Sequence, residues 1–352
     1  MTNPYVNLEE YQFWKKAVSQ IIPGSLDPVT EKKIIKPNEK IVTMGSCFAQ
    51  HLSNIIKKNN FNYYISEKPP ANLSVDEAKK KNYEVFSARY GNIYTVRQAL
   101  QLFERSFLNF LPERNIWKKK DRYLDAFRPF IEPDGFASEE ELLIDRKKHL
   151  EFVKNVFIKS NWFIFTLGLT EAWRSKMDGS IYPVAPGVAS DSIDEKEYEF
   201  NNFGIKEVIE DLENFIKKIY SVNPSINIIL TVSPVPLAAT YENRHVLVST
   251  VYSKSVLRVS IDEVKKKFKN VIYFPSYELI TTSLNASQYY EDDHRQVSEK
   301  GVSHVMRIFV KNFLEENKKM KTMSNNKIIY ENELSKINCD EDEITRIIDK
   351  TK

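Results

Sequence analysis

Apolar and polar positions form two kinds of segment along the chain. Short runs of β-branched and aromatic residues bounded by turn residues predict five strands: Lys40–Gly45, Phe61–Ser66, Trp162–Gly168, Ile226–Ser233 and Asn270–Ser276. Longer segments with apolar residues three and four positions apart predict helices: Phe48–Asn59, Glu139–Lys159, Ile205–Val222, Val246–Phe268 and Ser298–Glu316. Because the strands are apolar along nearly their whole length, helices should cover both faces of their sheet. We therefore expect an α/β fold with a doubly wound, five-stranded parallel sheet.

Three segments extend this alternation. Residues 68–133 have no strong strand pattern but contain a predicted helix, TVRQALQLFERSF, and loops rich in aromatic residues and proline. A connection of this length in a compact domain is usually functional. Arg174–Val184 predicts a hairpin that turns at Asp178 and Gly179. We expect an N-terminal helical extension (1–34), an α/β domain (35–317) with helical insertions, the main one at about 68–133, and a charged C-terminal tail (318–352) that is a peripheral helix or partly disordered.

Charge and cysteine content narrow the classes of partner. The 51 Lys and Arg residues nearly balance the 48 Asp and Glu residues, so a nucleic-acid partner is not implied. Cys47 and Cys339 are the only cysteines and lie far apart, which fits a reducing compartment better than a disulfide framework. No apolar block typical of a signal peptide occurs, and no run reaches the roughly 18 apolar residues of a membrane span. We expect a cytoplasmic protein, and the sequence leaves its oligomeric state open.

Residues able to do chemistry follow the predicted strands. Such residues are Gly45–Cys47, Gly168–Glu171, Ser233–Pro236 and the loop with Asp292, Asp293 and His294. The carboxyl ends of parallel strands meet at one edge of a sheet, where ligands bind. A thiol at the start of a helix should have its pKa lowered below about 8.5, so Cys47 is a candidate nucleophile. Packing is the alternative role, because cysteine is often buried, and Ser46 is a competing nucleophile or a helix cap.

Several motifs together resemble the GSCFA family. They are GSCFA at residues 45–49, YGNIYT, DAFRPFIEPDGFAS, FTLGLTEAW, TVSPVPL and VIYFPSYEL, spread over roughly residues 35–310. That family resembles the SGNH (GDSL-like) hydrolases, which implies a five-stranded, flavodoxin-like sheet. It also implies esterase, lipase or O-acyltransferase activity on lipids or carbohydrates. The SGNH motifs are a G-D-S turn, an oxyanion glycine, a G-x-N-D loop and a D-x-x-H segment.

The resemblance assigns roles to single residues. Cys47 takes the nucleophile position of G-D-S, and Gly91, with Asn92 beside it, takes the oxyanion glycine position. G-x-N-D falls on Gly168–Glu171, where Thr170 replaces asparagine as an oxyanion donor.

The D-x-x-H segment can be aligned in more than one way. In one frame Asp293 is the acid, and Gln296, which cannot take a proton, occupies the base position. In another, Glu291 and His294 form E-x-x-H, with His294 as general base for Cys47. His294 reaching the site from a shifted backbone position is the third alternative, and all three remain open.

Other residues have two interpretations each. Glu171, Trp173 and Arg174 are candidate substrate-binding residues, since a tryptophan face stacks on a sugar ring, although Trp173 also suits a core. Asp125 and Arg128 favour an ion pair that fixes the insertion. His245 is a reserve base or a helix start, and His51 tunes the thiol or is a partly exposed helix residue. We assign no chemistry to His149 and His304.

The sequence therefore predicts an acyl-transfer enzyme with a cysteine nucleophile. It is an ester hydrolase or O-acyltransferase acting on a carbohydrate or its precursor, and the insertion could cover the site. The cysteines and histidines show no metal-ligand spacing and no Gly-rich phosphate loop occurs, so we expect no metal and no cofactor, with acetyl-CoA as a candidate acyl donor. Two alternatives remain: a non-catalytic module that binds a glycan or acyl ligand, suggested by Gln296, and a cysteine hydrolase acting on amides.

Overall fold

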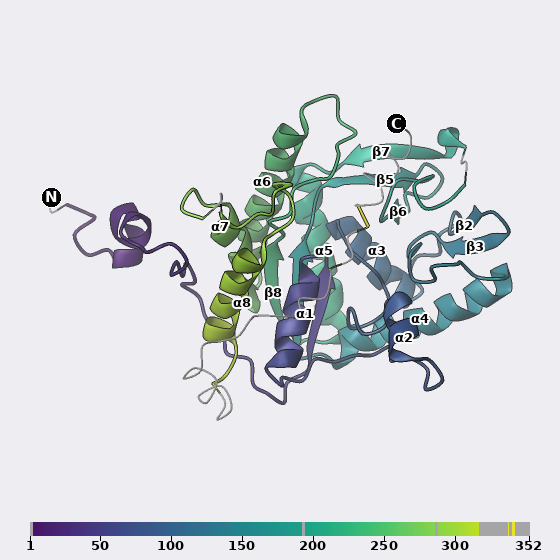
Figure 1. Cartoon of the computed structure of the whole chain (residues 1–352), viewed down its shortest axis with the longest axis horizontal. Helices are drawn as coiled ribbons and strands as arrows, with labels where there is room; N and C mark the ends of the chain where they lie inside the picture. Colours follow the sequence, from purple (N-terminus) through teal and green to yellow (C-terminus); the bar gives the residue numbers. More distant parts are fainter. Residues whose placement is uncertain (1–2, 192–193, 286–287, 317–336, 338–339, 342–352) are drawn as a thin grey trace.

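A four-stranded parallel sheet forms the centre of the molecule (Figure 1). The computed structural model describes residues 3–191, 194–285, 288–316, 337 and 340–341. The strand order is β1 (Ile41–Gly45), β4 (Trp162–Leu167), β8 (Asn227–Val232) and β9 (Val271–Tyr273). Every neighbouring pair is parallel, so all four carboxyl ends lie at the same edge, as expected from the sequence.

One of the five predicted strands, Phe61–Ser66, does not form, so that prediction is wrong. Its only contact of strand type in the described residues is a single parallel bridge between Tyr63 and Ile41. The backbone turns at Phe61, whose carbonyl accepts a hydrogen bond from the Tyr63 amide at 2.8 Å, and Ser66 then donates to Ser87. The apolar run therefore follows β1 too briefly to extend the sheet.

Helices cover both faces of the sheet, which confirms the doubly wound arrangement. Alternate strand residues point to opposite faces: Ile41 and Ile164 pack on one side, and Val42 and Phe163 on the other. The first side carries α1 (Ala49–Lys58), α7 (Ser276–Thr281) and α8 (Glu299–Phe313). The second side carries α3 (Val96–Ser106), α4 (Glu139–Lys159), α5 (Ile205–Val222) and α6 (Val246–Lys265). No helix in the described part of the chain is long and apolar enough to cross a membrane.

Two small antiparallel sheets are added to this core. The predicted hairpin after the third predicted strand is present, formed by β5 (Glu171–Ser175) and β6 (Ile181–Tyr182), and β7 (Tyr198–Asn202) joins β5. The insertion holds a hairpin that the sequence pattern did not predict, β2 (Ile116–Lys119) with β3 (Arg122–Asp125), besides the short helix α2 (Val75–Lys80). Four-residue strands are too short to give a periodic signal.

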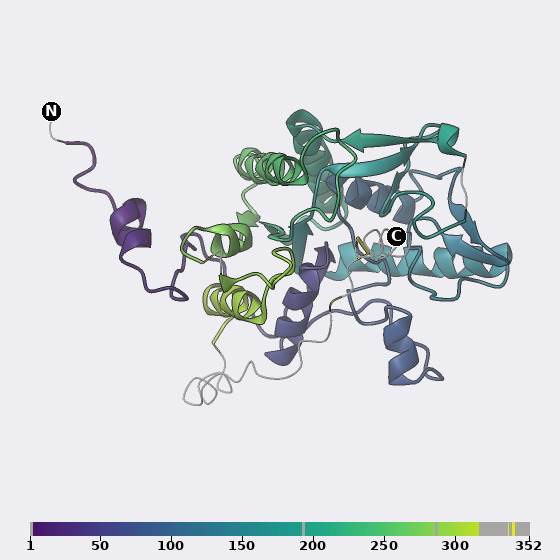
Figure 2. The same cartoon turned by 45° about the horizontal axis from the view of Figure 1, so that its top comes forward.

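The structure describes most of the predicted N-terminal extension but little of the predicted C-terminal tail. The N-terminal extension contains a 3₁₀ turn (Glu10–Gln12) and a short π-helix (Lys15–Ser19), and it reaches away from the sheet in both views (Figures 1 and 2). A further 3₁₀ turn, Glu195–Glu197, precedes β7. Except for residues 337 and 340–341, the predicted charged tail lies outside the described residues.

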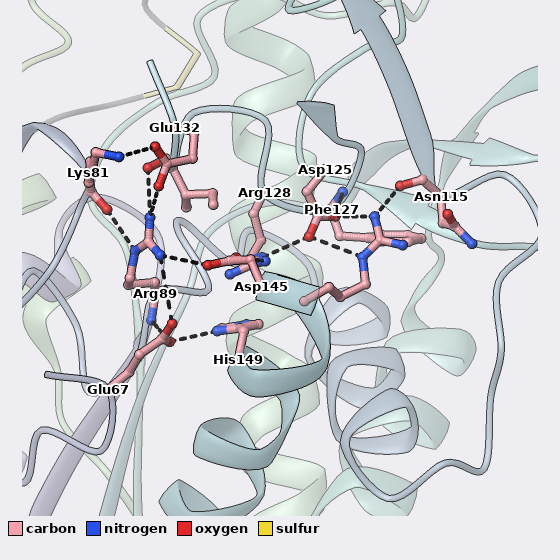
Figure 3. Close-up of polar contacts among 12 residues, drawn as sticks. Glu67, Lys81, Arg89, Asn115, Asp125, Phe127, Arg128, Glu132, Asp145 and His149 are labelled. Carbon is pink, nitrogen blue, oxygen red and sulfur yellow. Dashed lines mark hydrogen bonds and ion pairs between the residues drawn. The ribbon is translucent and has the colours of Figure 1, made fainter. Parts of the chain in front are cut away.

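A buried ionic network fixes the insertion to α4 (Figure 3). Asp125, at the end of β3, accepts hydrogen bonds from Arg128 Nε at 2.9 Å and Arg146 Nη2 at 3.0 Å, so the predicted Asp125–Arg128 ion pair is present. Burial would raise the pKa of Asp125, but the attraction of Arg146 and Arg128 outweighs it and holds this pKa well below its usual range. The carboxylate therefore stays charged inside the protein.

The same network continues through Arg89 and His149. The Arg89 guanidinium lies 2.8 Å from Glu132 and 3.2 Å from Asp145, and the Arg89 amide donates to Glu67 at 2.7 Å. Glu67 also lies 2.7 Å from His149 Nδ1, a ring for which the sequence predicted no chemistry. These contacts join three separate stretches of chain to α4. They hold the insertion next to the edge of the sheet where β1 and β4 end.

Candidate functional site

Cys47 follows a turn that only glycine can make. Gly45 has a φ of +140°, and a Cβ atom there would lie 2.8 Å from the Thr166 nitrogen and closer still to its carbonyl oxygen. The Ser46 amide donates to that carbonyl at 3.1 Å, which locks the end of β1 against β4. The chain then enters α1, with the Cys47 carbonyl accepting from the Gln50 amide at 3.0 Å. Cys47 therefore stands at the amino-terminal side of a helix, as predicted, and its side chain is buried.

Ser46 does not have its predicted capping role. Phe48 is the N-cap residue of α1, and no side chain caps that helix end. The Ser46 hydroxyl is buried, and within the part of the chain that the structure describes it has no hydrogen-bond partner. A Cβ atom placed on Gly168 would lie 3.1 Å from Ser46 Cβ, so the ends of β1 and β4 are in close contact beneath the site.

The loop carrying Gly91 and Asn92 crosses the ends of β1 and β4. The Ile93 amide donates to the Gly45 carbonyl at 2.8 Å, and the Tyr94 carbonyl accepts from the Gly168 amide at 3.0 Å. Gly91 has a φ of +70°, a conformation that favours glycine. Asn92 is buried and accepts a hydrogen bond from Gln50, one turn along the helix from Cys47. The structure thus brings Gly91 and Asn92, two of the three predicted oxyanion residues, to the edge where Cys47 lies.

Thr170 uses both of its hydrogen-bond donors in contacts with other residues of the fold. Its hydroxyl donates to Asn202 Oδ1 at 2.7 Å, while the Asn202 amide nitrogen donates to Glu242 at 2.8 Å and so fixes the orientation of that side chain. The Thr170 amide donates to the Ser253 hydroxyl at 3.0 Å. Both donors of the predicted oxyanion residue are thus used within the fold, and the expectation that this hydroxyl serves an oxyanion is not supported.

Lys254 is a buried residue at this edge that the sequence analysis missed. It lies on α6 with 2% of its surface exposed, and its ammonium group donates to the Gly168 carbonyl at 2.6 Å. Lysine is almost never fully buried without a specific contact. The signal was present in the sequence, since Lys254 lies on the buried face of an amphipathic helix that also carries Ser253 and Leu257.

The loop before α8 does not orient His294 towards a partner. Asp293 Oδ1 accepts hydrogen bonds from the backbone amides of Arg295 and Gln296, both at 2.9 Å, and so closes a tight turn. His294 is exposed, with a φ of +53°, and its ring has no hydrogen-bond or ion-pair partner in the described residues. Glu291 is also exposed and uses its backbone within the same turn. No contact among the described residues joins His294 to Asp293, Glu291 or Cys47 through its ring.

Arg295, the next residue, points inward instead. Its side chain is only 17% exposed, and Nη2 lies 3.1 Å from the carboxylate of Glu341. Asp340, beside it, donates its backbone amide to the Tyr94 hydroxyl at 3.1 Å. No sequence pattern signals these contacts, because they join positions far apart in the chain. The structure therefore places an arginine at this edge where a histidine had been expected.

A cavity of about 250 Å³ lies at the same edge. Two of the candidate substrate-binding residues, Glu171 and Trp173, line it together with Tyr94, Tyr182, Phe200, Tyr241 and Glu341. Burial raises the pKa of Glu171, although hydrogen bonds from the Thr240 hydroxyl and the Tyr241 amide oppose this. The Trp173 ring meets Tyr241 edge to face at 4.8 Å between centroids. Arg174 is not among the lining residues and pairs with Glu199 across the sheet.

The remaining histidines have structural positions. His245 is exposed and caps α6 by accepting from the Leu247 amide at 3.2 Å. His51 packs against Phe48, and desolvation lowers its pKa to about 3. His304 is buried between the Tyr289 hydroxyl and the Leu26 carbonyl. Among the described residues, no group of three or more His, Cys, Asp or Glu side chains could hold a metal ion.

Comparison with solved structures finds distant likenesses. A family 3 carbohydrate esterase from Clostridium thermocellum is 10% identical, over 78% of this chain and 94% of its own, with a TM-score of 0.34. A carbohydrate esterase family 3 protein from Talaromyces cellulolyticus is 11% identical, over 82% and 99%, with a TM-score of 0.37. The acetyl xylan esterase Est2A from Butyrivibrio proteoclasticus is 11% identical, over 80% and 64%, with a TM-score of 0.31.

The sequence itself matches a family model. Comparison with curated proteins finds no match. The model of the GSCFA family matches residues 40–309, a range that runs from the start of β1 into α8 and includes the Gly45–Cys47 turn. The chain belongs to the GSCFA family.

Proposed function

We propose that this protein is an acyl-transfer enzyme that uses Cys47 to cleave an ester of a carbohydrate or its precursor. The observation that carries the proposal is the turn at Gly45, which presents Cys47 at the start of α1 on the edge where the strand-end loops gather. A helix amino terminus favours the thiolate, which is the reactive form of cysteine. The aromatic cavity at the same edge offers a place for a sugar ring.

The proposed reaction has two steps. In the first, the Cys47 thiolate attacks the ester carbonyl, a thioester forms, and the sugar oxygen leaves with a proton. In the second, water or another sugar hydroxyl attacks the thioester and the thiol is restored. We propose the backbone amides of Cys47 and Gly91 as oxyanion donors, because Gly91 and Asn92 lie over the ends of β1 and β4. With acetyl-CoA as acyl donor, the Cys47 thiolate would instead attack the acetyl thioester, the CoA sulfur would leave with a proton, and a sugar hydroxyl would accept the acetyl group in the second step. A cytoplasmic location belongs to the same proposal.

Proton transfer needs an acid or base beside Cys47. His294 stays a predicted base, but its exposed ring lacks an orienting partner within the described residues. Lys254 is a second candidate, because it is buried at the end of β4, where Gly168 contacts Ser46. In this proposal the ammonium group of Lys254, which donates to the Gly168 carbonyl, supplies the proton that leaves with the sugar oxygen. A Lys254→Met variant should then lose turnover while a His294→Ala variant keeps most of it.

The test compares ester turnover with thiol reactivity in the full-length chain. Hydrolysis of p-nitrophenyl acetate should be lost in Cys47→Ala and retained in Ser46→Ala, the matched change one residue earlier. Iodoacetamide near neutral pH should label Cys47 rapidly, with peptide mass spectrometry separating this label from any on Cys339. Full turnover in Cys47→Ala would refute the proposed nucleophile.

A non-catalytic binding module is the second candidate function. It is favoured by the Thr170 hydroxyl, which is directed to Asn202, and by Gln296 at the position of the usual base. A protein of this kind would bind a glycan or acyl ligand in the cavity beside Trp173 but would show a slow thiol and no ester turnover. The third reading, a cysteine hydrolase acting on amides, predicts faster cleavage of an amide than of the matched ester.

A further inference from the structure

Two acidic residues from the end of the chain lie at the candidate site. Glu341 lines the aromatic cavity, and Asp340 lines a second, smaller cavity together with Gln50, Asn92 and Arg128. In Figures 1 and 2 they form the short yellow segment within the outline of the molecule. The strand-end edge therefore carries groups from three remote parts of the sequence: the loop after Gly91, the loop before α8, and residues 340–341.

The contact between Glu341 and Arg295 has the geometry of a bound carboxylate. Arg295 Nη2 and Glu341 Oε2 lie 3.1 Å apart, and the two side chains are 17% and 13% exposed. An arginine so far removed from water strongly favours an anionic partner. Tyr94, on the loop that crosses β1 and β4, holds the backbone of the same segment through its hydroxyl.

The surroundings also fit a ligand that combines a carboxylate with a ring. Glu341 enters a cavity whose other walls include the aromatic side chains of Trp173, Phe200 and Tyr241. The acidic group already lining this cavity, Glu171, is turned to the Thr240 hydroxyl at 2.6 Å and to the Tyr241 amide. Of the two acidic residues in the described part of the chain that line the cavity, Glu341 is the one that contacts Arg295, so the position of its carboxylate marks where a ligand carboxylate would bind.

We propose that Arg295, which reaches the aromatic cavity through its contact with Glu341, is a receptor for the carboxylate of a ligand, and that Glu341 occupies this receptor within the same chain. The ligand class is then a carboxylated sugar, such as a uronic acid unit, which must displace Glu341 to bind. This inference does not rest on Cys47 being a nucleophile, because it concerns binding. It goes beyond the proposed function by naming the acidic group that the substrate would carry.

The experiment measures binding of D-glucuronate, with D-glucose as the uncharged probe, by calorimetry on full-length proteins. Glu341→Gln keeps the size of the side chain and removes its charge, so it should bind glucuronate about tenfold more tightly than the unaltered protein, the scale of one charge-assisted hydrogen bond. Glu315→Gln makes the same change at an exposed position in the segment after α8 and should have no effect. Glucose binding should be equal in all three proteins.

Variants of Arg295 form the second part of the experiment. Arg295→Gln combined with Glu341→Gln should abolish the gain in glucuronate binding, while Arg295→Lys with Glu341→Gln should keep part of it. Circular dichroism and melting curves establish that each variant is folded. Equal glucuronate affinity in Glu341→Gln, Glu315→Gln and the unaltered chain would overturn the proposal. Because calorimetry needs no turnover, failure here is distinct from failure of the acyl-transfer proposal.

Discussion

Replacement of Gly45 by alanine should destabilise the protein strongly, because this position combines two separate costs. A residue with a side chain at a φ of +140° is strained by about 1 to 3 kcal/mol. The new Cβ would also lie 2.8 Å from the Thr166 nitrogen and 2.9 Å from its carbonyl carbon, and backbone atoms cannot move aside as a side chain does. Separating β1 from β4 to make room should cost about another 1 to 3 kcal/mol. The expected loss is about 2 to 6 kcal/mol.

Gly179→Ala is the matched control. Gly179 also has a positive φ, +72°, but a Cβ there would meet nothing within 4 Å, so only backbone strain of about 1 to 2 kcal/mol applies. Urea unfolding followed by circular dichroism gives the free energy of unfolding of both variants. Gly45→Ala should unfold at a clearly lower urea concentration. If the two variants unfold together, the close approach of β1 to β4 does not constrain this turn, and the placement of Cys47 loses its physical basis.

Three further predictions concern the network and the loops around the site. Asp125→Asn should lower the free energy of unfolding by about 3 to 5 kcal/mol in urea titrations, because it leaves Arg128 and Arg146 buried without their carboxylate. Glu67 has its pKa lowered from 4.5 to about 2, since His149 and Arg128 outweigh its burial; its stabilising effect is therefore present above about pH 4.5 and is lost as the pH falls towards 2. Between pH 4.5 and about 2, the melting temperature of Glu67→Gln should therefore fall less steeply than that of the unaltered protein. An equal fall in both proteins would contradict the lowered pKa of Glu67. Thr170→Val should lower stability by about 1 kcal/mol and leave ester turnover largely intact, whereas a loss of turnover like that of Cys47→Ala would restore its oxyanion role.

Much of the fold could be predicted because it depends on local patterns. The bounds predicted for the helices at Glu139–Lys159 and Ile205–Val222 are those of α4 and α5. Amphipathic spacing marks such helices, and a capping side chain marks a start, as Ser138 does for α4. Phe61–Ser66 has an equally apolar pattern, but the hydrogen bonds that turn it away from β1 depend on the insertion. Its failure as a strand therefore has no local signal.

The site could be predicted only in part. Cys47 lies at the carboxyl edge because parallel strands bring their ends together, which follows from chain order. Gly91 lies in the insertion, and its position was expected only from the family resemblance. The partner of the Thr170 hydroxyl depends on Asn202, which lies on a strand of the second sheet. Arg295 points inward to pair with Glu341, which lies far away in the sequence. Such choices depend on tertiary contacts, which the sequence pattern does not reveal.

The central claim, that Cys47 carries the acyl group, is tested most directly by trapping the intermediate. The protein is mixed with p-nitrophenyl acetate, quenched in acid within one turnover, and digested for peptide mass spectrometry. The peptide that contains Cys47 should carry one acetyl group, which forms and is lost at rates compatible with turnover. Turnover without an acetyl group on Cys47, or with the acetyl group on another residue, would contradict the central claim.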